Sequence, residues 1–179
     1  MAGIDIIASS LIMALIQLLV GLVLSMGSVY IGLKMFDKLT KGIDEWKEIQ
    51  KGNVAVGIVM TAVIISIATV IKIGVLSLTA SIDPATGVTM MALGLVVGIV
   101  NLAIGVIAAI ISIYVAINVL DKITTEIDEM KELKKGNVAV ALIIAGVLIA
   151  VSFVISAAVE GITSALDVTQ VAMALGIRA

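Results

Sequence analysis

The chain offers few of the side chains that carry out catalysis or hold metals. It has no Cys and no His among its 179 residues, which excludes thiolate nucleophiles, imidazole bases, disulfides and zinc sites built on Cys or His. Its acidic residues gather in two charged segments or near the ends of apolar stretches, and no glycine-rich phosphate loop occurs. We therefore expect no enzymatic activity, no catalytic residue, no cofactor and no metal site.

Two charged residues, Lys72 and Glu160, interrupt long apolar stretches. A charge inside a membrane segment is costly, which makes each residue a candidate for an ion or proton pathway. Both lie near one end of their stretch, however, and a lysine placed there can extend its amine to the membrane surface. We expect a structural role, in which Lys72 reaches the surface or pairs with Glu160 within or between subunits.

A row of small and polar residues recurs at helical spacing in the first and third apolar stretches. Gln17 and Asn101 lie in the middle of the two rows, where an amide can hydrogen-bond across a helix interface. Small neighbours let helix backbones approach closely, so the rows predict packing within the chain or between protomers. A polar pore lining is the alternative. The predicted packing residues are Ala14, Gln17, Gly21, Ser28, Gly32, Gly94, Gly98, Asn101, Gly105, Ser112 and Ala116.

Composition indicates which elements must position these residues. The chain is 61 % hydrophobic and 13 % charged, whereas soluble domains average roughly 45–50 % and about 25 %. Its mean hydropathy is +1.29, so a lipid bilayer must serve as part of its solvent. The net charge of −2 and the lack of a basic cluster exclude nucleic acid as a partner.

Uncharged stretches predict four membrane-spanning helices, over about 6–35, 54–80, 88–120 and 138–160. Nine of the eleven basic residues lie between the first and second spans or between the third and fourth. The positive-inside rule therefore predicts a multi-pass protein of the cell membrane with cytoplasmic charged segments and both termini outside. The acidic start of the chain is unlike a signal peptide, so we expect the first span to be retained.

The chain contains an internal duplication with an offset of 84 residues. Between 37–56 and 121–140, 14 of 20 residues are identical. This match defines one repeat over 1–83 and a second over 84–179. Each repeat has an even number of spans, so both enter the membrane in the same sense and a pseudo-twofold axis follows the membrane normal. The predicted fold is all-α, an integral membrane four-helix bundle of two tandem helix–loop–helix repeats.

The charged segments, 37–51 and 121–135, show apolar residues at helical spacing and predict amphipathic helices. Asp44–Lys47, Glu48–Lys51 and their equivalents Asp128–Lys131 and Glu132–Lys135 have the i,i+3 spacing of ion pairs. A solvated helix is the favoured interpretation, and a docking surface for a soluble protein is the alternative.

Each charged segment closes on a Gly-Asn pair. Gly52 and Gly136 suit the left-handed position that ends a helix. Asn53 and Asn137 can then cap the next span by accepting a bond from an early backbone N–H. A phosphate site at these helix starts is a less favoured interpretation, since only one glycine is present at each.

The end of the chain predicts an amphipathic tail over 161–179. Thr163, Asp167, Gln170 and Arg178 share one face of such a helix. The tail would lie on the membrane or contact a neighbouring subunit.

The duplicated two-helix unit, with a charged loop closing on Lys-Gly-Asn-Val-Ala-Val in both copies, resembles the domain of unknown function 350 family of small prokaryotic membrane proteins. This resemblance implies a tandem four-helix membrane protein and carries no established activity.

Three functions remain compatible with the sequence. The first is a structural or scaffolding protein that self-associates as a ring, tube or filament. The second is a small channel or transporter with Gln17 and Asn101 as its polar lining. The third is a membrane anchor that recruits a cytoplasmic stress protein through the glutamates of its charged segments, Glu45, Glu48, Glu129 and Glu132.

Overall fold

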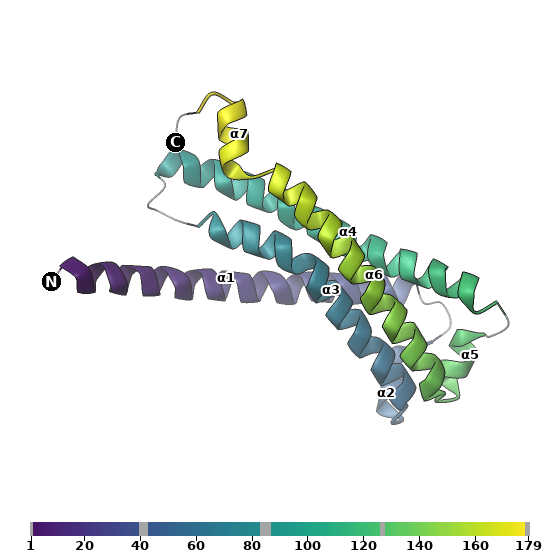
Figure 1. Ribbon diagram of the computed structural model, residues 1–179. Helices are drawn as coiled ribbons and strands as arrows, with labels where there is room; N and C mark the ends of the chain where they lie inside the picture. The colour runs from purple at the N-terminus through teal and green to yellow at the C-terminus, as the bar shows by residue number, and fades with distance from the viewer. Residues whose placement is uncertain (1, 40–42, 83–86, 126–127, 178–179) are drawn as a thin grey trace.

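The computed structural model describes residues 2–39, 43–82, 87–125 and 128–177, and within these ranges every regular element is a helix. The helices are α1 (Ala2–Leu39), α2 (Glu45–Gln50), α3 (Val54–Ala80), α4 (Val88–Ile123), α5 (Glu129–Lys134), α6 (Val138–Ala165) and α7 (Val168–Ala174). The start of α1 and the short helix α7 lie at one end of the elongated molecule, whereas α2 and α5 lie at the other, the charged end (Figure 1).

Four segments are long and apolar enough to cross a membrane: Ser10–Lys38, Val54–Ala80, Val88–Ile123 and Val138–Ala174. The predicted all-α membrane fold is therefore confirmed. A polypeptide crosses a bilayer as a helix because each backbone N–H and C=O then finds a partner within its own segment.

The charged segments do not form the long amphipathic helices predicted over 37–51 and 121–135. α1 and α4 continue into these segments, and separate six-residue helices, α2 and α5, follow them. The reason is local, because Asp44 and Asp128 have extended backbones and act as N-caps. Each carboxylate accepts a bond from a backbone N–H three residues later, which starts a new helix.

The predicted tail over 161–179 is also not a single helix. α6 extends to Ala165, beyond the predicted boundary at 160, and the chain then turns at Leu166. Asp167 caps α7 by accepting from the backbone N–H of Thr169, so the expected continuous polar face is interrupted. Arg178 lies outside the described residues.

α3 lies at the centre of the bundle and packs against α1, α4 and α6. The buried core consists mainly of branched aliphatic side chains, and Ile67, Ile113 and Leu148 are among the largest that are fully enclosed. Side chains of this kind fill the spaces between close helices with few voids.

The two repeats run in the same sense, but the bundle is open on one side. If a complete pseudo-twofold axis related the two repeats, α6 would contact α1 as extensively as α3 contacts α4. Within the described ranges, α6 and α1 form no comparable contact, and α1 runs away from the other long helices toward its start (Figure 1). The pseudo-twofold is therefore incomplete.

Candidate functional site at the polar helix contacts and the charged end

The small residues of α4 pack against α3 at backbone distance. A Cβ atom built on Gly98 would lie 2.6 Å from the Cα atom of Leu78, and one built on Gly74 would lie 2.6 Å from the Cα atom of Leu102. Real Cβ atoms do not approach so closely, so both positions require glycine. Close backbone approach of this kind drives helix association in membranes.

Asn101 lies within this contact and is 1 % exposed. Its amide nitrogen donates to Ser77 Oγ at 2.7 Å, which joins α4 to α3. Its Oδ1 atom is buried and has no partner among the described residues. The side chain therefore bridges two helices of one chain, instead of facing the surface as a pore lining would.

The corresponding row on α1 also faces α3, but less closely. Gln17 is half-buried and donates from Nε2 to the carbonyl oxygen of Ile82 at 3.1 Å. A Cβ on Gly32 would meet the side chain of Ile67 at 2.6 Å, whereas Ala14 is exposed.

The remaining predicted packing residues are placed as follows. Ser28, Ser112 and Ala116 are buried, and Gly94, Gly105 and Gly21 contact Ser81, Ile71 and Thr79 respectively. Apart from Ala14, the predicted packing residues thus turn toward other parts of the same chain.

The Gly-Asn pairs build two nearly identical turns at the charged end. Gly52 and Gly136 have φ angles of 80° and 79°, a left-handed conformation that costs glycine little. Asn53 and Asn137 accept from the backbone N–H groups of Val56 and Val140 at 3.3 and 3.4 Å. In each turn the glycine and asparagine N–H groups also bond back to the last carbonyls of the short helix, a Schellman motif.

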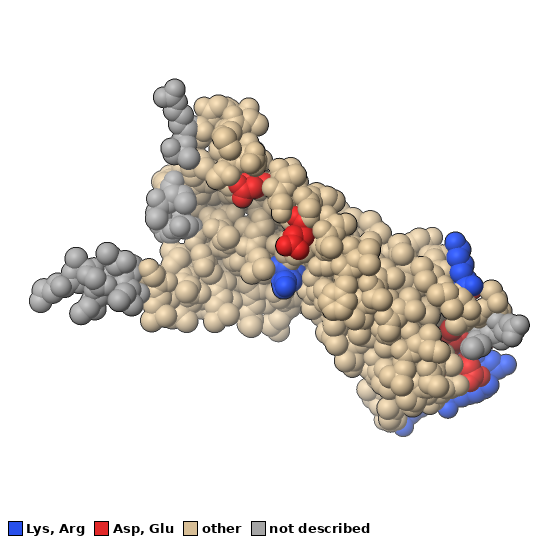
Figure 2. Space-filling view, in the orientation of Figure 1, with Lys and Arg blue, Asp and Glu red and all other residues tan. Residues whose placement is uncertain are grey.

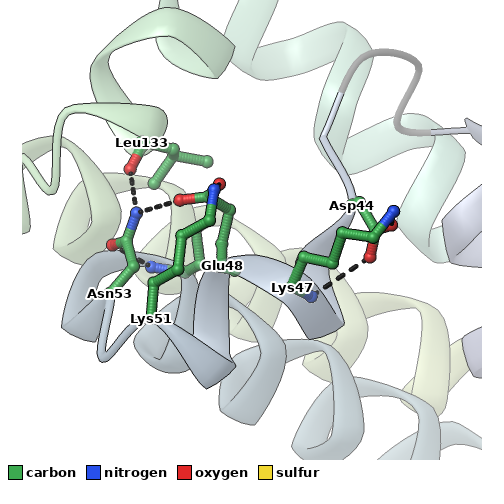
Figure 3. Close-up of polar contacts among 7 residues, drawn as sticks. Asp44, Lys47, Glu48, Lys51, Asn53 and Leu133 are labelled. Carbon is green, nitrogen blue, oxygen red and sulfur yellow. Dashed lines mark hydrogen bonds and ion pairs between the residues drawn. The ribbon is translucent and has the colours of Figure 1, made fainter.

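Only the first turn reaches across to the other repeat. Asn53 Nδ2 donates to the carbonyl oxygen of Leu133 in α5 at 2.9 Å and to Glu48 Oε2 at 3.2 Å (Figure 3). The amide of Asn137 donates to Glu132 Oε2 within its own turn. Sequence reasoning missed the cross-repeat bond, because the two asparagines have the same local sequence.

The carboxylates around these turns are held in their charged form. Ion pairs join Asp44 to Lys47, Glu48 to Lys51 and Glu132 to Lys135 at 2.6–2.7 Å. Hydrogen bonding from Lys51, and then from Asn53, lowers the pKa of Glu48. For Glu132 the amide of Asn137 is the larger cause of a lowered pKa, followed by Lys135.

The predicted Asp128–Lys131 ion pair is wrong. Between these two described residues, the carboxylate of Asp128 bonds to the backbone N–H of Lys131, and no ion pair joins the side chains. Asp128 thus keeps only the capping bond to Lys131, whereas the equivalent Asp44 caps α2 through Oδ1 and also pairs with Lys47 through Oδ2.

Two glutamates expected on a solvated surface are withdrawn from it to different degrees: Glu45 is buried, and Glu129 is half-buried. Glu45 is 6 % exposed, and the Oε1 atom of Glu129, its repeat equivalent, is buried without a partner among the described residues. Both line a cavity of about 40 Å³ whose walls are mostly apolar, including Phe36 and Leu133. Of the four glutamates in the recruitment hypothesis, Glu45 is therefore removed from the outer surface, whereas Glu48 and Glu132 remain partly exposed.

Lys72 is the only charged residue of α3, and Glu160 is the only one of α6. Both are exposed. A bond from Ser156 Oγ to the carbonyl oxygen of Thr69, 3.3 Å long, joins the two helices about one turn before each charge, so the charges lie at similar depth. Figure 2 shows a basic group beside an acidic group on one face, with further acidic atoms nearby toward the end that carries α7. The two side chains form no ion pair with each other or with another described residue.

No group of three or more acidic residues that could hold a metal ion occurs within the described part of the chain. Comparison with curated proteins and with solved structures finds no match. A family model described as Domain of Unknown Function (DUF350) matches residues 7–108 and again residues 90–177. The two matches cover both repeats, and the chain therefore belongs to the DUF350 family as a tandem membrane protein.

Proposed function

We propose that this protein is a non-enzymatic structural protein that self-associates in the membrane as a homo-oligomer, with its charged end in the cytoplasm. The observation that carries the proposal is the open side of the bundle. α3 holds α4 through a close contact, yet the described parts of α6 and α1 form no comparable contact.

An incomplete internal symmetry favours association between copies. In repeat architectures, a surface that is buried between neighbouring units inside the chain remains uncovered at the last unit. A second copy can cover it, and closed or open assemblies result according to the rotation between copies.

The polar side chains support a structural role. Asn101, Gln17 and Asn53 each donate to another segment of the chain. Such bonds hold helices in register in lipid, where each contributes about 0.6 kcal/mol and at most about 2 kcal/mol. They are engaged in packing, which argues against the channel with a lining of Gln17 and Asn101.

Cryo-electron microscopy of the protein in native membranes tests this function. We expect a regular homo-oligomer without a continuous aqueous path. A monomer, or a complex in which Asn101 faces a water-filled lumen, would contradict the proposal and favour the channel.

A further inference from the structure

Two opposite charges on the outer surface of the bundle form no ion pair with any described residue. Lys72 and Glu160 are exposed, lie on adjacent helices and form no ion pair with each other within the chain. Lys72 is the nineteenth residue of α3, so it lies roughly 27 Å along the axis from the charged end. A charge at that depth is costly when it faces lipid.

Glu160 borders a strip of exposed residues on α6, Ala158, Gly161, Ile162 and Ala165. A Cβ atom built on Gly161 would meet nothing within 4 Å. The strip is therefore open at Gly161, and its small residues, Ala158, Gly161 and Ala165, would let another helix approach closely beside Ile162.

The repeat shows what this strip can hold. Its equivalents on α3 are Gly74, Ser77, Leu78 and Ser81, and these residues seat α4. Gly74 packs against the backbone of α4, and Leu78 and Ser81 pack against glycines of α4. Ser77 accepts a hydrogen bond from Asn101 of the same helix. The same face is thus filled by a helix in the first repeat and open in the second.

We propose that a second copy of this chain seats on the strip of α6, so that Lys72 of one copy neutralises Glu160 of the other. This inference rests on the proposed self-association and names its contact. The charges are self-complementary, so a twofold contact forms two such pairs at once. Ala158 replaces the glycine at the equivalent of position 74, which keeps the approaching helix further away than α4 lies from α3.

The surroundings of Lys72 suit such a contact. An open groove of about 520 Å³ between α1 and α3 is lined by Lys72, by the hydroxyl-bearing Ser25 and Thr69, and by apolar side chains such as Val29 and Leu76. Side chains of the second copy can enter this groove, which places the ion pair between two protein surfaces.

Charge exchange between copies tests the contact. Full-length copies with two different affinity tags are co-expressed and co-purified from membranes. Lys72→Glu copies alone, and Glu160→Lys copies alone, should co-purify about tenfold less than wild type, because like charges then face each other. A mixture of the two variants should recover the wild-type level, since each copy supplies the charge that the other needs.

Several results would overturn the inference. Single variants that associate normally would show that the charges are not at the contact. Recovery only in the double variant Lys72→Glu/Glu160→Lys, and not in the mixture, would show that the charges pair within one chain. Failure of wild-type copies to co-purify would instead remove the proposed function itself.

Matched charges on another face provide the control. Ile107 is 57 % exposed on α4 and lies near the depth of Lys72, because Gly105 packs against Ile71. Co-expressed Ile107→Lys and Ile107→Glu copies should co-purify no better than either variant does alone. An increase over the single variants equal to that of the Lys72→Glu and Glu160→Lys mixture would mean unspecific attraction and would overturn the contact.

Disulfide cross-linking provides a test that leaves each fold nearly unchanged. The chain has no cysteine, so a Lys72→Cys copy and a Glu160→Cys copy can form only engineered disulfides. We expect a heterotypic dimer in oxidised membranes, at least tenfold above that of Ile107→Cys with Glu160→Cys. Equal yields for both pairs would contradict the contact.

Discussion

The first helices of the two repeats, α1 and α4, occupy opposite environments although they descend from one duplicated unit. Only 6 % of the apolar window of α1 is buried, against 44 % in α4. Both helices direct their small residues toward α3, but only α4 reaches backbone contact. Gly98 provides that contact, and its equivalent in α1, Ala14, is exposed.

This difference shows how a duplicated helix acquires two roles. The repeat preserves the small-residue row, the turn and the span length, so both copies can form the same helix. The direction of α1 determines how closely the first copy joins the bundle, because α1 runs away from the other long helices toward its start and leaves Ala14 exposed. The open side that remains at α6 is the consequence.

The largest expected effect comes from filling the closest contact. Gly98→Leu should destabilise the protein by about 3 kcal/mol or more, because its side chain would overlap the backbone of α3. Ala14→Leu, the matched change in the first repeat, should alter stability by less than about 0.5 kcal/mol. Thermal unfolding in detergent, followed by size-exclusion chromatography, measures both. Equal losses would remove the distinction between α1 and α4.

The second largest expected effect is a difference in stability between variants of the two asparagine caps. Asn53→Ala removes both a helix cap and the bond to Leu133, for a total of about 2 kcal/mol. Asn137→Ala removes a cap of similar geometry without a bond to the other repeat and should cost about 1 kcal/mol. Hydrogen exchange at the start of α3 and α6 reports the change locally. A larger loss at Asn137 would contradict the bridging role of Asn53.

Removing the hydrogen bond from the buried side-chain amide of Asn101 should have a smaller effect on stability. Asn101→Ala and Ser77→Ala each remove the same bond, and a double-mutant cycle should give a coupling of about 0.6–1.7 kcal/mol. Gln17→Ala, in the other repeat, should cost less because Gln17 is only half-buried. A coupling near zero would show that the bond to Ser77 does not stabilise the α3–α4 contact.

The smallest expected effect is the pH dependence of the turns. The pKa values of Glu48 and Glu132 are lowered in the folded protein. Their stabilisation is therefore present above the unfolded pKa and is lost as the pH falls through the lower folded pKa. Fluorescence of Trp46, the single tryptophan of the chain, should stay constant on acidification to the ordinary glutamate range and change only below it.

Moving the tryptophan sharpens the comparison of the two turns. The double variant Trp46→Met/Met130→Trp places the probe in α5, at the repeat-equivalent position. Both probes should respond in the same acidic range, since each turn holds its glutamate by an asparagine amide and a lysine. A response near neutral pH in either variant would contradict the lowered pKa values.

Local features of the molecule could be predicted from the sequence. The four spans, the duplication and the reversal at each Gly-Asn pair depend on residues that are close along the chain. Hydrophobic length determines whether a segment can cross the bilayer, and a glycine followed by asparagine is suited to end one helix and start the next. The charged segments form shorter helices than predicted because Asp44 and Asp128 act as N-caps, which start a new helix inside each segment.

The environment of each residue was decided only by the tertiary structure. Asn53 and Asn137 share their local sequence, yet only Asn53 contacts the other repeat, and Glu45 is enclosed although its segment is highly charged. Such contacts join residues far apart in the chain, so they depend on the direction and distance of whole helices. The sequence by itself determined the helices and their turns; the packing around α3 decided which polar groups are enclosed and which charges remain at the surface.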